Sequence, residues 1–270
     1  MIFCKLVRPD TTRLNQETEN MEVHHHPDLH HKPKKFKEYF SEFIMIFLAV
    51  TLGFIAENVR EHFTERSKER QYIEGFIRNL KDDTATLHHV IEFDNRLVKG
   101  LDSMQKISHL NMAIDSNRKL FYHFATEYLY SSASFKSNDA TLQQLKNTGD
   151  YRLIEKDHVA DSLTKYDADI HGIYDQGDYY EAYFKEILSR LDDLMDVTVI
   201  DDTSFSKNGK MTDKPFPPLR GDKEKLSIFF NKVFDLKVIT YSYAERNLKP
   251  QLEIAKNLIA FLKKEYGIED

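Results

Sequence analysis

The chain has 270 residues, of which 41% are hydrophobic and 30% are charged, and its mean hydropathy is -0.56. These averages exclude a membrane protein with many spans and a wholly disordered chain. The net charge of -6 gives no basic surface of the kind that binds nucleic acid, so no nucleic-acid partner is expected. With only 9 Gly and 7 Pro, the chain favours long helices over many short strands. We therefore predict an all-α protein.

Residues 1–38 form the first predicted region, a flexible tail rich in His and Lys. Cys4 is the only cysteine, so no intramolecular disulfide can form. The composition changes at Met21, and we expect translation to begin there. Five closely spaced histidines are potential metal ligands: His24, His25, His26, His30 and His31. Pro27 and Pro33 prevent a helix that would pre-position these ligands, so we favour a polar juxtamembrane tail and expect no metal or other cofactor.

Residues 43–56 are apolar on all sides, with only Thr51 and Gly53 less strongly apolar. A surface helix has a single apolar stripe, so this pattern differs from that of a surface helix. With its aromatic flank the stretch extends over residues 39–59, about 31 Å of helix, which matches one bilayer core. We predict a single transmembrane helix there, and the alternative is a buried core helix of a soluble bundle. The residues that define the span are Tyr39, Phe43, Ile44, Phe47, Leu48, Val50, Leu52, Phe54, Ile55 and Ala56.

Basic residues flank the predicted span equally. Those before it are Lys32, Lys34, Lys35 and Lys37, and those after it are Arg60, Arg66, Lys68 and Arg70. Because long downstream domains cross membranes largely regardless of charge, the short tail is expected to stay inside. For a bacterial protein this predicts a cytoplasmic N-terminus, a single pass through the inner membrane and a periplasmic C-terminal domain.

A resemblance to a known family covers residues 24–62, HHHPDLHHKPKKFKEYFSEFIMIFLAVTLGFIAENVREH. This stretch resembles the start of a family of uncharacterised bacterial single-pass membrane proteins, whose members begin with a short His/Lys-rich tail followed by this apolar helix. A second stretch, residues 135–154, resembles a pattern in the family's outer domain. Its matching positions are Phe135, Ser137, Thr141, Leu142, Leu145, Gly149, Arg152, Leu153 and Ile154. The resemblance implies a membrane protein that begins at Met21, and it implies no activity.

Residues 60–270 are predicted to form one helical extramembrane domain. No proline interrupts residues 59–99, so the spanning helix is expected to continue into a bundle of long helices and to end near Gly100. Four glutamates recur every four residues and predict a solvated face: Glu57, Glu61, Glu65 and Glu69. A stripe with helical spacing predicts packing into the bundle: Ile73, Phe76, Ile77, Leu80, Thr84, Leu87, Ile91, Asp94 and Val98.

Further helices are predicted over residues 118–130, 139–147, 157–195, 223–247 and 251–266. Asp157 is expected to cap its helix, Gly149 to stop the short one, and Pro250 to kink or break the last. Residues 197–222 are predicted to form a long surface loop that starts with a strand-like segment over residues 197–200.

The chain contains few patterns typical of catalysis. Asp167-x-Asp169-x-His171-Gly172 resembles part of a calcium loop, but the apolar helical period runs through it and favours a continuous helix. His88 and His89 lack the HExxH spacing of metalloproteases. No phosphate-binding or dinucleotide-binding glycine motif occurs. We predict no catalytic, cofactor-binding or metal-binding residue.

These features favour a protein that is not an enzyme. We expect a membrane-anchored helical interaction or accessory protein, of scaffold or sensor type. Its expected partners are the lipid bilayer and either a protein partner or a second copy of the chain. One alternative is a subunit of an oligomeric channel or transporter, with Thr51, Gly53 and the end glutamates Glu42 and Glu57 around a shared pore. Another is a helical hydrolase or metal enzyme that gathers His, Asp and Glu from distant helices.

Overall fold

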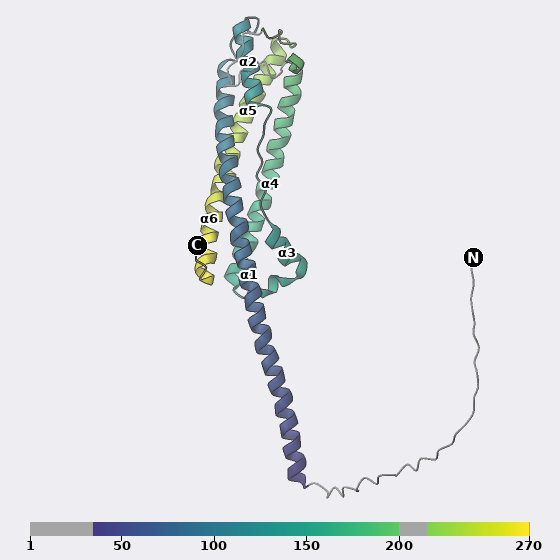
Figure 1. Cartoon of the computed structure of the whole chain (residues 1–270). Helices are drawn as coiled ribbons and strands as arrows, with labels where there is room; N and C mark the ends of the chain where they lie inside the picture. The colour runs from purple at the N-terminus through teal and green to yellow at the C-terminus, as the bar shows by residue number, and fades with distance from the viewer. Residues whose placement is uncertain (1–34, 200–214, 270) are drawn as a thin grey trace, which may run out of the picture. The chain divides into compact units, whose positions relative to one another are not determined.

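The computed structural model describes residues 35–199 and 215–269, which form helices and their connections (Figure 1). None of these described residues forms a strand, so the predicted all-α class is confirmed for them. The tail histidines and Cys4 lie outside the described residues. In chain order the elements are α1 (Phe36–Lys106), α2 (Asp115–Tyr128), α3 (Ala140–Thr148), the 3-10 helix η1 (Asp150–Leu153), α4 (Asp157–Asp192), the 3-10 helix η2 (Val197–Val199), α5 (Lys223–Tyr243), the π-helix η3 (Ala244–Leu248) and α6 (Lys249–Tyr266).

The chain divides into two compact units, one ending at Asn58 and the other beginning at Val59. In the first unit the described residues belong almost entirely to α1, and their large apolar side chains are exposed. Phe43 is 61% exposed and Phe54 is 72% exposed. Among the described residues, α1 is the helix long and apolar enough to cross a membrane, and no part of its most apolar stretch is buried.

In the second unit three long helical segments pack together, namely the later part of α1, α4, and the run from α5 to α6 (Figure 1). The Glu69 carboxylate of α1 accepts hydrogen bonds from the Glu155 N–H before α4 and from the Tyr266 hydroxyl at the end of α6. Farther along α1, Asp102 pairs with Lys237 of α5 at 2.8 Å. Between these two points Tyr166 of α4 donates to Asp83 of α1, so α1 and α4 run in the same direction, whereas the run from α5 to α6 goes in the opposite direction.

The core of the second unit consists of two apolar clusters. One joins α1, α3, α4 and α6 and contains the fully buried Ile73 and Leu87. The other joins α1, α2, α4 and α5 and contains the fully buried Leu101 and Phe121. Each fully buried side chain of this size contributes about 1.5–3 kcal/mol relative to an exposed one, so the two clusters are the main source of stability.

Two predictions about α1 are wrong. The helix does not end near Gly100 but continues to Lys106. Gly100 lies under the Tyr128 ring of α2, where an added Cβ would come within 2.3 Å of ring carbons, so this glycine permits close helix packing. Glu69 is not on a solvated face, because its side chain is only 4% exposed and is held by the two hydrogen bonds described above.

Three other boundaries differ from the sequence prediction. Residues 197–199 form a 3-10 helix and not a strand, and residue 200 lies outside the described part. Lys156, not Asp157, is the N-cap residue of α4. The last two helices are joined by the π-helix Ala244–Leu248 just before Pro250. Pro250 has no N–H for the Arg246 carbonyl four residues earlier, and the wider π-turn accommodates the proline without ending the helical run.

Candidate functional site

A cleft lies in the second unit between α1, the segment that leads into α3, and α4. Its cavity volume is about 50 Å³, which is room for a group of a few atoms and is smaller than the pockets that enclose drug-sized ligands. Its walls combine aromatic, aliphatic and polar side chains: Phe76, Asn79, Leu80, Asp83, Ser137, Asn138, Asp139, Leu142, Tyr166, Asp167, Ile170, His171 and Tyr174. We call it the Asp83 cleft.

Asp83 is a buried carboxylate in the wall of this cleft and is 1% exposed. Its Oδ2 accepts hydrogen bonds from the Ser137 hydroxyl at 2.5 Å and the Tyr166 hydroxyl at 2.7 Å. Its Oδ1 accepts one from the Asn138 N–H at 2.6 Å. Burial raises the pKa of Asp83, and these three hydrogen bonds oppose the rise. All three donors are neutral, so they stabilise the charge of the carboxylate without cancelling it.

The segment leading into α3 is held against α1 and α4 by specific contacts. The Ser137 N–H donates to the Tyr174 hydroxyl at 2.9 Å, and the Thr141 N–H donates to Asn79 Oδ1 at 3.2 Å. Gly75 permits this approach, because a Cβ added there would lie 2.8 Å from Thr141 Oγ1. The cleft wall is therefore held in place by contacts within the chain.

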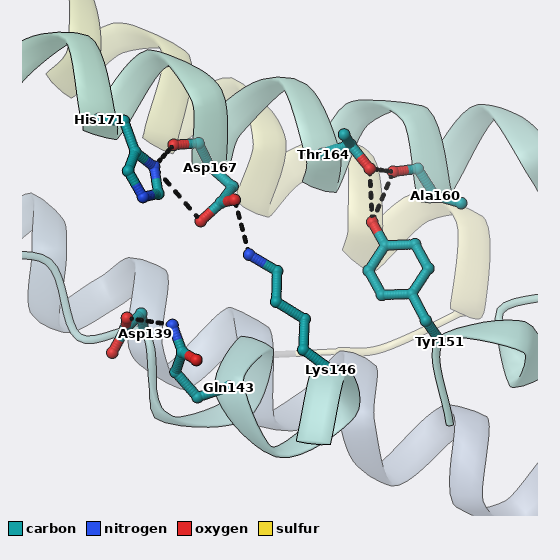
Figure 2. Close-up of polar contacts among 8 residues, drawn as sticks. All are labelled: Asp139, Gln143, Lys146, Tyr151, Ala160, Thr164, Asp167 and His171. Carbon is teal, nitrogen blue, oxygen red and sulfur yellow. Dashed lines mark hydrogen bonds and ion pairs between the residues drawn. The ribbon is translucent and has the colours of Figure 1, made fainter. Parts of the chain in front are cut away.

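Figure 2 shows polar contacts at the rim of the cleft, one between α3 and α4 and the others within α4 and at the start of α3. Lys146 Nζ donates to Asp167 Oδ2 at 2.8 Å, and His171 Nδ1 lies 2.7 Å from the Asp167 carbonyl oxygen. On the facing segment, Gln143 Nε2 donates to Asp139 Oδ2 at 2.9 Å. Asp167 thus has a cationic partner, whereas this contact of Asp139 is with a neutral amide.

A second set of contacts in Figure 2 anchors the turn after α3. The Tyr151 hydroxyl donates to the Ala160 carbonyl at 3.0 Å and lies 2.7 Å from Thr164 Oγ1. Gly149 makes the turn possible, since its φ of 71° lies in the left-handed region. The expected stop of the helix at Gly149 is confirmed. These contacts keep α3 beside α4 and so maintain the rim.

Acidic side chains outnumber basic ones around the Asp83 cleft. The carboxylates in or beside it are Asp82, Asp83, Asp139 and Asp167. Lys146 pairs with one of them, and no ion pair to Asp83 occurs among the described residues. A cleft lined by one sign of charge concentrates ions of the opposite sign. The site is therefore suited to a positively charged group.

Asp83 is one of three acidic side chains of α1 that are buried in the bundle. Glu69, Asp83 and Asp94 are 4%, 1% and 0% exposed, and all three face the bundle. Glu69 and Asp83 receive hydrogen bonds, but neither carboxylate oxygen of Asp94 has a partner. The sequence pattern included Asp94 in the apolar stripe but missed Asp83. An acid at a position with the helical period of a buried stripe is the signal that could have identified both.

Of the matching positions in residues 135–154, Ser137 and Leu142 line the cleft, and the others hold the α3 segment in place. Phe135, Leu145 and Ile154 are buried in the core, Thr141 lies against Gly75, and Gly149 forms the turn. Arg152 lies 3.8 Å from Glu65 of α1. These contacts pack residues 135–154 onto α1.

Asp167 and His171 of the calcium-like sequence line the cleft, as do Phe76 and Leu80 of the apolar stripe. The span residues are exposed, except that Ile44 is half-buried. Asp169 pairs with Lys165 inside α4, and the predicted continuous helix through the calcium-like sequence is confirmed. His88 lies 3.5 Å from Glu92, one helical turn away. Within residues 35–199 and 215–269, no group of three His, Cys, Asp or Glu side chains could hold a metal ion.

Comparisons of the chain with protein-family models, curated proteins and solved structures give no match. The contacts described above are therefore the basis for proposing a function.

Proposed function

We propose that this chain is a membrane-anchored helical interaction or accessory protein of the bacterial inner membrane, with a cytoplasmic tail and a periplasmic domain over residues 60–270. The observation that carries this proposal is the exposed apolar stretch of α1, where Phe47, Leu52 and Phe54 are each more than half exposed. Apolar surface in water costs about 25 cal/mol per Å², and a bilayer core removes this cost. The resemblance of residues 24–62 to single-pass membrane proteins supports the same anchoring.

In this proposal the Asp83 cleft is the contact site for the partner and accepts a positively charged group. Asp83 Oδ1 has one hydrogen-bond donor and retains capacity for another. Phe76 and Tyr174 supply aromatic faces, which attract cations. Leu80 and Leu142 can pack against the apolar stem of an alkylammonium group, such as the side chain of lysine.

Membrane anchoring is tested by extraction of cell membranes at alkaline pH. The double variant Leu48→Arg/Leu52→Arg places two charges in the proposed span, whereas Ser67→Arg/Gln71→Arg places them at exposed positions farther along α1. A charged side chain at the centre of a bilayer costs about 2.5–3.5 kcal/mol on insertion scales. The wild type and the Ser67/Gln71 variant should stay in the membrane, and the Leu48/Leu52 variant should be released. Extraction of the wild type would contradict the anchoring.

The orientation is tested separately with reporters fused after residue 270. A reporter active only in the periplasm should give signal, and one active only in the cytoplasm should not. The reverse result would overturn the proposed topology while leaving the anchoring intact.

Cation binding in the Asp83 cleft is tested with butylammonium as the probe and butanol as its uncharged counterpart. Butylammonium should shift NMR signals of Asn138 and His171, and the shifts should be lost in Asp83→Asn and kept in Asp102→Asn. Equal shifts with butanol, or shifts unaffected by Asp83→Asn, would contradict a cation site.

A further inference from the structure

The most unusual polar group in the described part of the chain is the carboxyl of Asp94. Its side chain is 0% exposed, and neither Oδ1 nor Oδ2 has a hydrogen-bond partner. Buried polar groups in native proteins are nearly always hydrogen-bonded, and an unpaired buried charge is far more costly than an unpaired neutral group. Glu69 and Asp83, on the same buried face of α1, both follow this rule. Asp94 therefore requires a different explanation.

The surroundings of Asp94 contain two buried hydroxyl groups. The hydroxyls of Tyr180 in α4 and Thr240 in α5 are buried close to each other without a hydrogen bond of normal geometry, and the two side chains are 1% and 0% exposed. Tyr243 of α5 stacks on Tyr180, with ring centroids 5.7 Å apart and an interplanar angle of 9°. The negative charge of Asp94 raises the pKa of both tyrosines, so both feel the same carboxylate.

No basic side chain offsets this charge. Among the described residues, no lysine, arginine or histidine forms an ion pair with Asp94. The titratable groups that face it are Tyr180 from α4 and Tyr243 from α5, which are neutral at ordinary pH. Burial alone raises the pKa of Asp94 to about 7.

We propose that Asp94 is a buried proton-binding site, at which the packed bundle of α1, α4 and α5 holds the neutral carboxylic acid and releases its proton to solvent when the site opens. The neutral acid has an O–H donor and acceptor oxygens, so it can exchange hydrogen bonds with Tyr180 and Thr240 after small side-chain rotations. The ionised form has acceptors only and needs water in a space that is closed. This inference goes beyond the proposed function and does not depend on the Asp83 cleft.

The position of Asp94 links protonation of its carboxylate to the packing of the end of α5. Thr240 and Tyr243 belong to the last turn of α5, and the π-helix Ala244–Leu248 follows directly. π-turns within helices are frequently found at functional sites. Entry of water beside an ionised Asp94 separates this turn from α1 and changes the packing next to the joint between α5 and α6.

The direct test is infrared spectroscopy of the full chain in lipid vesicles with 13C-labelled aspartate. A carboxylic-acid C=O band should be present at about pH 5.5 and should disappear by about pH 9. Its midpoint should lie near the pKa of Asp94, about 7. Asp94→Asn should lose the component of the band that has this midpoint, and Asp83→Asn, which removes the other buried aspartate with a raised pKa, should retain it. Absence of the band in the wild type at low pH, or its persistence at high pH, would overturn the proposal.

A second measurement does not depend on the folding of Asp94→Asn. Tyr180→Phe removes one hydroxyl beside Asp94 without changing the shape of the ring, and it should move the midpoint of the band. Tyr179→Phe alters an exposed neighbour and should leave the midpoint unchanged. Identical midpoints in both variants would contradict the assignment of the band to Asp94.

Discussion

Tyr128 packs its ring directly on the backbone of Gly100, so that α2 approaches α1 more closely than any other residue at position 100 would allow. Gly100→Ala should therefore destabilise the second unit. The added methyl group would lie within 2.3 Å of the ring, and overpacking of this kind costs about 1–3 kcal/mol.

Urea denaturation of the full chain in detergent measures this effect, and Gly172→Ala provides the matched control. Gly172 is also helical, but it has nothing within 4 Å of the added Cβ. Its replacement should stabilise the protein by about 0.5–1 kcal/mol, because alanine is the better helix former. Equal effects at the two positions would show that the Tyr128 contact is not tight.

Tyr166→Phe should destabilise the protein by about 1.5–3 kcal/mol, because it removes a hydrogen bond to the charged, buried Asp83. The pKa of Asp83 should also rise further, since this hydrogen bond favours the ionised form. Chemical denaturation measures the stability, and carboxyl NMR measures the pKa. Tyr179→Phe is the control, as Tyr179 is 59% exposed, and it should change neither quantity. A neutral result for Tyr166→Phe would mean that Asp83 is satisfied by its other donors.

The ion pair of Asp102 with Lys237 makes the free energy of unfolding fall as the pH falls. A buried acid with a raised pKa, such as Asp94, makes it fall as the pH rises. Hydrogen bonds from Lys237 and Lys106 lower the pKa of Asp102 from 3.8 to about 2. A depressed carboxyl pKa contributes stability above pH 3.8, and this contribution is lost as the pH falls toward 2. Acid unfolding of the wild type should therefore include protonation of Asp102.

Replacement of the two lysines separates their roles. Lys237→Gln should return the pKa of Asp102 most of the way toward 3.8, and Lys106→Gln should have a smaller effect, because Lys106 is 74% exposed and Lys237 only 25%. The pKa is read from the carboxyl carbon of Asp102 by NMR. A larger shift in Lys106→Gln would contradict this order.

Helical periodicity and turn residues predicted much of the fold. The apolar spacing after Ile73, the stop at Gly149 and the helical run before and after Pro250 all agree with the structure. The end of α1 could not be predicted, because Gly100 is a helix-stop signal in isolation and a packing position only once Tyr128 is known to lie above it. The β-branched residues Val197–Val199 have high strand propensity, but without a partner strand among the described residues they form a 3-10 turn.

The candidate site was harder to predict than the fold. Asp83, Ser137 and Tyr166 are far apart in the sequence and meet only after α4 packs beside α1. A single aspartate between apolar positions is ambiguous, since most aspartates on helices are solvated. Asp94 belongs to the apolar stripe that the sequence predicts. That it has no hydrogen-bond partner could not be predicted, because its neighbours Tyr180 and Thr240 come from two other helices.

The most direct test of a membrane-anchored protein with a partner contact at the Asp83 cleft is photo-crosslinking in native membranes. A photoreactive residue at position 171, in the wall of the cleft, is compared with one at position 89, which is exposed and outside it. We predict one discrete adduct from position 171 that is lost in Asp83→Asn and is reduced by butylammonium but not by butanol. No adduct from position 171, or the same adduct from position 89 regardless of Asp83, would contradict the account.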